Sequence, residues 1–365
     1  MVSPKKKRSE SRTESSGRNR SGLRAQGSGK GGARFTVHGS RKGWHPRQAS
    51  ASGRRSPGKR PDLKVEIAGI PLKNPVMTAS GTFGYGNEFT PFFDLNALGA
   101  IIVKTLTMHP RPGNAPPRIA ETPGGMLNSI GLQNVGIDGF LKHKLPFLRT
   151  LATPLFVNIA GKSVEEFADL AKRLSDAEGV AGIEPNISCP NVAGGLDFGT
   201  DPRLTYEVVR SIRQASPLPV IPKLSPNVTD VTVIARAAAD AGADALSLIN
   251  TIVGMVIDLR SRRPKLPGAT GGLSGPAIRP IAVRMVWEVA QAVKIPVIGI
   301  GGIMTGDDAV EFLLAGATAV QVGTANFLDP LAPMKVLTGI EAYLIRHKID
   351  SVTQLIGAAL PHQKS

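Results

Sequence analysis

Between residues 63 and 360, short apolar runs alternate with stretches whose apolar residues recur at helical spacing. The runs have the length of buried strands and occur at 75–81, 100–107, 154–161, 181–190, 218–226, 243–251, 296–302 and 318–324. Amphipathic segments such as 163–177 and 230–241 lie between them. This alternation predicts an α/β fold whose eight parallel strands close into a (β/α)8 TIM barrel. A doubly wound open sheet is the alternative, but the even strand count and the polar residues at strand ends favour the barrel.

Three connections along the predicted barrel are longer than the others. Residues 108–150, 191–203 and 252–280 follow the second, fourth and sixth strands. Connections that follow barrel strands lie at the C-terminal face, where barrel enzymes place their chemistry. We therefore expect C-terminal-face insertions that roof one pocket. Before the barrel, residues 64–73 around Gly69 predict a small hairpin that plugs the opposite end.

The first 60 residues differ sharply from the rest of the chain. They contain 17 Lys and Arg against 2 Asp and Glu, whereas the remaining 305 residues contain 27 against 26. The net charge of +16 therefore belongs almost entirely to this tail. Its Ser, Gly and Arg content and its lack of apolar periodicity predict a disordered basic N-terminal extension at 1–60, followed by one catalytic domain at 61–365.

Four interpretations of the tail remain open. It could be a solvated extension, or translation could begin further downstream than Met1. The basic run at residues 5–8 could instead serve nuclear import or RNA binding, and an Arg- and Ser-rich leader with few acidic residues could be a transit peptide. Nucleic-acid contact by the tail is possible but has no further support in the sequence.

Composition limits the location and the redox chemistry. No apolar run approaches the roughly 20 residues that cross a bilayer, and no signal-peptide centre follows Met1, so we expect a cytoplasmic protein without membrane attachment. The single cysteine, Cys189, excludes an internal disulfide and argues against a zinc or iron–sulfur site held by this chain. We predict no metal site, so a redox centre would be an organic cofactor or would lie on a partner.

Glycines and polar side chains mark the ends of the predicted strands. Gly301 and Gly302 follow the seventh strand, and Gly323 and Thr324 follow the eighth. Barrels often bind phosphate through backbone N–H groups at these two strand ends, so together with Gly275 they predict a phosphate-bearing cofactor.

Lysines and amides occupy the other strand ends. Lys104 and Lys223 end the second and fifth strands, and Asn158, Asn186 and Asn250 end the third, fourth and sixth. A ring of amides suits a planar heterocycle, because amides both donate and accept hydrogen bonds. Two lysines supply positive charge for a carboxylate or for a reduced cofactor ring.

The segment 186–191, Asn-Ile-Ser-Cys-Pro-Asn, places Cys189 at the rim of the predicted pocket. No His or acidic residue accompanies it, which argues against a Cys–His acyl-transfer site and leaves a thiolate acting as a base. A free thiol has a pKa of about 8.5, so such a base needs local activation.

With these residues in view, 63–360 resembles class 1 dihydroorotate dehydrogenases, nearest to the class 1B, NAD-linked catalytic subunit. The matching motifs are Ala-Ser-Gly at 79–81, Val-Lys-Thr at 103–105, Asn-Ser-Ile-Gly-Leu-Gln-Asn at 128–134, the segment 186–191, Lys-Leu-Ser-Pro-Asn at 223–227, Ile-Asn-Thr at 249–251, Gly-Gly-Leu-Ser-Gly-Pro at 271–276 and Gly-Thr-Ala-Asn at 323–326. Pro185 and Pro222 depart from the family pattern and put the geometry of the fourth and fifth strands in question.

The resemblance implies FMN-dependent oxidation of (S)-dihydroorotate to orotate in de novo pyrimidine (UMP) biosynthesis. It implies that Cys189 removes the C5 proton while a hydride passes from C6 to the flavin. The residues that it assigns to the substrate are Lys104, Asn128, Ser129, Ile130, Gly131, Leu132, Asn186, Asn191, Asn250 and Thr251. Those that it assigns to one FMN are Ser80, Lys104, Thr105, Asn158, Asn186, Lys223, Ile249, Gly275, Gly301, Gly302, Gly323 and Thr324.

The resemblance also implies a partner. Class 1B enzymes pass electrons to NAD, yet this chain contains no Gly-x-Gly-x-x-Gly nicotinamide fingerprint and only one cysteine. FAD and an iron–sulfur cluster are therefore expected only on an electron-transfer subunit, joined to a homodimer of this chain in a heterotetramer.

Other readings compete with this one. A class 1A enzyme would use fumarate, although Gln133 and the pair Asn326-Phe327 favour class 1B. Class 2 enzymes use a serine base and an apolar N-terminal helix, which Cys189 and the polar tail oppose. A tRNA-dihydrouridine synthase is also a flavin barrel with a cysteine and would explain the basic tail through phosphate contacts, but the barrel segment itself is near neutral. A non-catalytic nucleic-acid-binding chain on an inactive barrel is opposed by the intact set of motifs.

Overall fold

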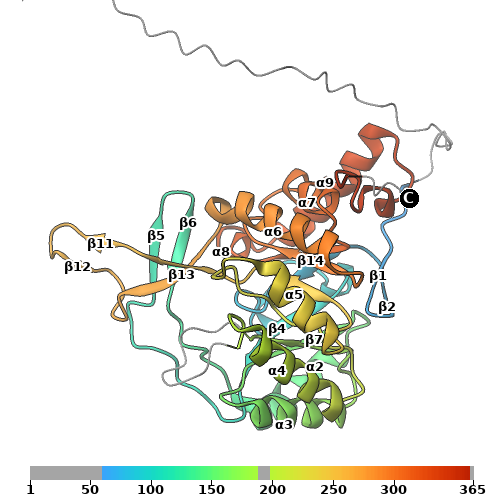
Figure 1. The fold of residues 1–365 in the computed structure, drawn as a ribbon. Coiled ribbons are helices and arrows are strands. Elements are labelled where there is room, and N and C mark those ends of the chain that lie inside the picture. Colours follow the sequence, from blue (N-terminus) through green and yellow to red (C-terminus); the bar gives the residue numbers. More distant parts are fainter. Residues whose placement is uncertain (1–59, 188–197, 362–365) are drawn as a thin grey trace, which may run out of the picture. The chain divides into compact units, whose positions relative to one another are not determined.

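The computed structural model describes residues 60–187 and 198–361, and its central strands close into a parallel barrel (Figure 1). The regular barrel strands are β3 (Val76–Thr78), β4 (Ile101–Leu106), β7 (Leu155–Ile159), β8 (Gly182–Pro185), β9 (Leu246–Leu248), β14 (Val297–Ile300) and β15 (Ala319–Val322). They form the ladders β3-β15-β14-β9 and β4-β7-β8. A Met77–Ala100 bridge joins β3 to the β4 side, and residues 220–223 join β8 to β9. The predicted α/β barrel is confirmed.

The fifth barrel position, predicted at 218–226, is held by isolated bridges rather than by a regular strand. Lys223 pairs with Asn186 on one side and with Ser247 on the other. Pro222 has no N–H to donate, although its carbonyl accepts a hydrogen bond from the backbone of Ser247 at 3.0 Å. Pro185 ends the regular strand β8, and its carbonyl accepts from the backbone N–H of Lys223 at 2.9 Å. The proline at 222 therefore accompanies irregular pairing, whereas the proline at 185 does not.

Helices follow most of the barrel strands and surround them. The α-helices are α1 (Gly136–His143), α2 (Leu145–Leu148), α3 (Val164–Ser175), α4 (Pro202–Ala215), α5 (Val231–Asp240), α6 (Arg279–Ala292), α7 (Gly306–Leu314), α8 (Ala325–Leu328) and α9 (Ala332–His347), and the 3-10 helices are η1 (Asn87–Phe89), η2 (Leu95–Ala97), η3 (Pro276–Ile278) and η4 (Val352–Leu355). Side-chain N-caps start several of them: Ser163 begins α3, Asp201 begins α4, and Thr305 forms a capping box on α7. Between β3 and β4 the crossover contains η1 and η2 in place of an α-helix. In the described part of the chain, no helix combines the length and apolarity needed to cross a membrane.

Two of the predicted insertions combine into one small sheet. Strands β5 (Ile119–Thr122) and β6 (Gly125–Asn128) come from the first insertion, and β10 (Ile252–Met255) and β13 (Thr270–Ser274) come from the third. They pair in the antiparallel order β10-β13-β6-β5, and Figure 1 shows them together at one side of the barrel. A separate ribbon, β11 (Ile257–Asp258) with β12 (Arg263–Pro264), extends from the same insertion. We call the four-stranded unit the roof sheet. Most of the insertion at 191–203 lies outside the described residues.

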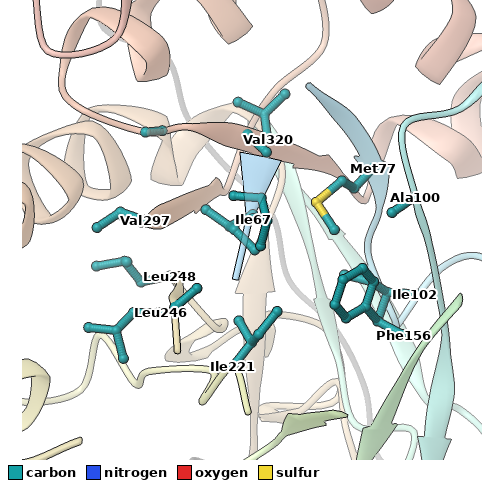
Figure 2. Packing of buried hydrophobic residues seen from close by; sticks show 14 of the residues in the cluster. Ile67, Met77, Ala100, Ile102, Phe156, Ile221, Leu246, Leu248, Val297 and Val320 are labelled. Carbon is teal, nitrogen blue, oxygen red and sulfur yellow. The ribbon is translucent and has the colours of Figure 1, made fainter. Parts of the chain in front are cut away.

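The predicted hairpin before the barrel is present. Strands β1 (Val65–Ile67) and β2 (Ile70–Leu72) pair antiparallel around Ala68 and Gly69, whose φ angles of 54° and 77° suit a tight hairpin turn. Ile67 is fully buried, and Figure 2 shows it among side chains of the barrel strands that include Leu246 and Val320. Since these residues lie near the beginnings of their strands, the hairpin closes the end of the barrel opposite the strand ends.

Candidate active site

A cavity of about 1290 Å³, including its open mouth, lies at the carboxyl ends of the barrel strands. Residues at the ends of β3, β4, β9, β14 and β15 line it, together with residues of the roof sheet such as Met126 and Ser274. Because connections that follow parallel barrel strands meet at one face, Ser80 and Thr324 contribute to the same wall. The insertions that contain β6 and β13 therefore border the pocket, as predicted.

One side of the cavity is a glycine-lined cradle. Gly301 and Gly302 have φ angles of 130° and 74°, a region that favours glycine. A Cβ atom on Gly302 would stand 2.7 Å from the Cβ of Arg279 and 2.8 Å from the carbonyl oxygen of Gly275, so no larger residue fits. Thr324 closes the cradle by donating from its hydroxyl to Ser274 Oγ at 2.8 Å. The open backbone at the ends of β14 and β15 fits the phosphate of FMN, the cofactor that the resemblance implies.

Amide side chains form another part of the wall. The side-chain nitrogen of Asn250 donates to Asn186 Oδ1 at 3.0 Å, and the Asn250 oxygen accepts from the backbone of Thr251 at 2.9 Å. Across the pocket, Asn128 at the end of β6 donates to the carbonyl of Gly272 in β13 at 3.2 Å. These contacts fix amides that offer both donors and acceptors to a planar ring.

Positive charge dominates the cavity. Among the described residues that line it, Lys104 and Lys223 are charged and none is acidic. Burial lowers the pKa of Lys104 below its ordinary value of 10.5, the positive charge of Arg118 lowers it further, and Glu88 opposes the shift. The pocket is therefore suited to an anionic ligand.

A buried polar layer lies inside the barrel at positions that sequence reasoning missed. Glu184 in β8 is 1% exposed, and its carboxylate accepts hydrogen bonds from Asn158 Nδ2 (2.6 Å), Ser247 Oγ (2.8 Å) and Gln321 Nε2 (2.6 Å). Barrel interiors are usually filled by branched apolar side chains, so this layer is unusual.

A sequence signal for this layer exists. Glu184, Ser247 and Gln321 stand two residues before the pocket-lining Asn186, Ile249 and Gly323, so they share the inward side of their strands. A polar residue at such an alternate position inside an apolar strand marks the layer beneath a site.

Most of the predicted site residues meet in the pocket. Those that line it are Ser80, Lys104, Thr105, Asn128, Ile130, Gly131, Leu132, Asn186, Lys223, Ile249, Asn250, Thr251, Gly275, Gly301, Gly302, Gly323 and Thr324. Asn158 and Ser129 do not: Asn158 is buried against Glu184, and Ser129 accepts a hydrogen bond from Asn114. Cys189 and Asn191 lie outside the described residues. Met126, Ile119, Gln133 and Phe327 also line the cavity and were not predicted as site residues.

Comparison with known proteins identifies the family. A model of the dihydroorotate dehydrogenase family matches residues 62–344. The chain belongs to the dihydroorotate dehydrogenase family. One relative, named dihydroorotate dehydrogenase B (NAD(+)), catalytic subunit, from Geotalea uraniireducens, is 64% identical over 302 residues, which cover 82% of this chain and 99% of the relative. A protein of the same name from Geobacter sulfurreducens is 64% identical over 300 residues, covering 82% and 98%.

A solved structure of a dihydroorotate dehydrogenase supports the same fold. The DHODH of Eimeria tenella, crystallised with ferulenol, superposes with a TM-score of 0.70 at 22% identity, covering 84% of this chain and 90% of that chain. The predicted resemblance to the class 1B, NAD-linked catalytic subunits is confirmed by the names of the relatives. The matched region of the family model begins at residue 62, so the boundary at 60 and the character of the tail stay predictions.

Proposed function

We propose that this chain oxidises (S)-dihydroorotate to orotate with FMN, as the catalytic subunit of an NAD-linked enzyme of pyrimidine synthesis. The observation that carries the proposal is the pocket itself, where two lysines, a set of fixed amides and a glycine cradle meet at the strand ends of a chain from this family. This chain aligns with nearly the whole length of the relatives whose names contain this activity.

The cradle and the barrel strand ends would hold the cofactor. The open backbone at Gly301, Gly302 and Gly323 suits the phosphate, and Lys223 lines the same cavity beside Asn186. Bound FMN would supply the acceptor for the hydride that leaves substrate C6. Binding and orienting the substrate and removing its C5 proton fall to side chains of this chain.

Substrate recognition is a matter of charge and amide geometry. Dihydroorotate carries one carboxylate and a ring with alternating C=O and N–H groups. Lys104 supplies the positive charge, and Asn128, Asn186 and Asn250 present donors and acceptors at fixed positions. None of the described residues that line the cavity is acidic, so no carboxylate among them repels the substrate.

Proton removal at C5 is assigned to Cys189 on the family motif at 186–191. The thiolate takes the proton from C5 as the hydride leaves C6, which forms the C5=C6 double bond of orotate. A thiol of ordinary pKa is mostly protonated at neutral pH, so the rate should increase with pH until the thiol is ionised.

Electron transfer to NAD requires a partner in this proposal. The relatives are named catalytic subunits, which supports a second subunit. The resemblance gives that subunit FAD and an iron–sulfur cluster and gives this chain a homodimeric arrangement within a heterotetramer.

The test is anaerobic reduction of the flavin by dihydroorotate in the purified chain, compared between wild type and Cys189→Ala. We expect Cys189→Ala to retain FMN and to bind orotate within roughly tenfold of wild type, while reduction slows by about 10²–10⁴-fold. Reduction at a near-normal rate would refute the role of Cys189.

The electron acceptor is tested on the reduced wild-type chain. We expect negligible NAD reduction until the electron-transfer subunit is added. Fast turnover with fumarate by the chain alone would assign it to class 1A instead.

A further inference from the structure

Asn134 makes an unusually complete set of hydrogen bonds two residues beyond the segment 128–132, most of which lines the pocket. Its side-chain nitrogen donates to the carbonyl of Leu132 at 2.7 Å and to Thr107 Oγ1 at 2.8 Å. Its side-chain oxygen accepts from the backbone of Gly136 at 2.7 Å and of Thr107 at 3.2 Å. An amide has two N–H donors and two acceptor lone pairs, so all four are used. The residue is 7% exposed.

The residue that Asn134 holds is strained. Leu132 has φ 54°, in the left-handed region that a branched side chain rarely adopts. It also stands between two cavities, because it lines both the main pocket and a second one beside Thr107 and Lys162. Strained backbone at a site persists only where surrounding contacts impose it, and such strain is often part of the function.

The rest of the segment is held by other contacts. Asn128 donates to Gly272, and the backbone of Asn114 donates to the carbonyl of Ile130 at 2.9 Å. These bonds fix the first half of the segment against the roof sheet and the loop at 114. Asn134 fixes its second half at the Leu132 carbonyl.

We propose that Asn134 is a positioning residue that holds Leu132 in its left-handed conformation and so sets the substrate-facing segment 128–132. The inference rests on the proposed function, which makes this segment a substrate contact. Asn134 acts through Leu132 and through the Thr107 and Gly136 backbone that frame the segment, and not by contact with the substrate.

The test is a double-mutant cycle between Asn134→Ala and Leu132→Gly. Orotate affinity is read from the flavin absorbance change, together with KM, kcat, FMN content and Tm. We expect Asn134→Ala to weaken orotate binding by about tenfold or more, which is about 1.4 kcal/mol, with FMN content unchanged. Because glycine adopts a left-handed φ without strain, the same change in the Leu132→Gly background should cost about twofold or less.

Two further variants separate positioning from general stability. Asn134→Asp keeps the acceptor for the backbone of Thr107 and Gly136 but loses the donations to the Leu132 carbonyl and to Thr107 Oγ1, so it should lose affinity even if Asn134→Ala folds poorly. Asn74→Ala is the matched control, because Asn74 is 3% exposed and also bonds two backbone groups, at Val76 and Ala97, outside the pocket lining. It should lower Tm and leave orotate affinity unchanged.

Two results would overturn the proposal. One is the same factor for Asn134→Ala in both backgrounds, and the other is an equal affinity loss in Asn74→Ala. Either result, with wild type binding orotate normally, refutes the positioning role alone. A wild-type chain that neither binds orotate nor is reduced by dihydroorotate refutes the proposed function and this inference with it.

Discussion

Replacing Glu184 by leucine should destabilise the barrel far more than an ordinary core substitution of similar size. Three donors, on Asn158, Ser247 and Gln321, would lose their acceptor, and each of these residues is fully buried. A buried donor left without a partner costs about 1–3 kcal/mol, so three cost about 3–9 kcal/mol before relaxation. Removing a buried carboxylate offsets part of this, and we expect a loss of about 3–6 kcal/mol.

The conservative variant should behave differently. Glu184→Gln keeps the volume and one acceptor oxygen, and its NH2 group has acceptors available after local rotation. In the described part of the chain, the side-chain oxygens of Asn158 and Gln321 are buried and accept no hydrogen bond. We therefore expect Glu184→Gln to lose about half as much stability as Glu184→Leu, and Ser247→Ala, which removes one donor, to lose about 1 kcal/mol.

Thermal unfolding at one scan rate, with and without added FMN, measures these differences. In a domain of about 300 residues a change of 1 kcal/mol shifts Tm by about 1.5 °C, so Glu184→Leu should melt at least about 4 °C below wild type. The expected order is Ser247→Ala above Glu184→Gln, and Glu184→Gln above Glu184→Leu. A leucine variant that melts within about 1 °C of wild type would show that the polar layer contributes nothing to stability and would refute this reasoning.

Three other outcomes follow from the site and the chain ends. Orotate affinity should fall as pH rises through the pKa of Lys104, which burial places below 10.5, because the neutral amine no longer attracts a carboxylate; orotate titrations across pH should show this fall in wild type and not in Lys104→Met. Gly302 has φ 74°, and Gly302→Ala would put a Cβ within 2.7 Å of Arg279, so the FMN content of the purified protein should fall about tenfold or more. Full flavin content in that variant would contradict the cradle. A chain that begins at Pro61 keeps the hydrogen bond from Asp62 to the carbonyl of Asp350, and we expect it to melt within a few degrees of full length and to retain its flavin; loss of flavin on truncation would show that the tail supports the barrel.

The barrel could be predicted from sequence because its strands are short apolar runs separated by residues that favour turns and loops. The fifth strand was predicted at its observed position, but it is not a regular strand. Pro222 has no backbone N–H to donate, and the pairing of this strand depends on residues of the neighbouring strand such as Ser247. The roof sheet was not predicted, because its central strand β13 begins Thr-Gly-Gly, a run with low strand propensity. Its pairing with β6 is set by tertiary contact.

The site was predictable to the extent that its residues come at strand ends. Lys104, Asn186 and Gly323 were expected in the pocket and line it. Asn158 also ends a strand, but it is buried against Glu184, and no pattern in its own strand distinguishes the two outcomes. Whether an inward side chain reaches the pocket or is buried beneath it depends on its depth in the barrel, which the sequence of one strand does not reveal.

The roof sheet also constrains how the protein is made on the ribosome. Asn128 in β6 pairs with Gly272 in β13, so the two partners are synthesised about 140 residues apart. At about 5–20 residues per second, the hairpin of β5 and β6 must wait roughly 7–30 s for its partner strand β13. During that interval the inner edge of β6 is an unpaired strand edge, which can pair with another chain. The segment that faces the substrate thus gains its final sheet neighbours only after residue 272 is synthesised, and the cradle at Gly301 and Gly323 is made later still. Translation between residues 128 and 272 should therefore be a stage at which nascent chains need a chaperone.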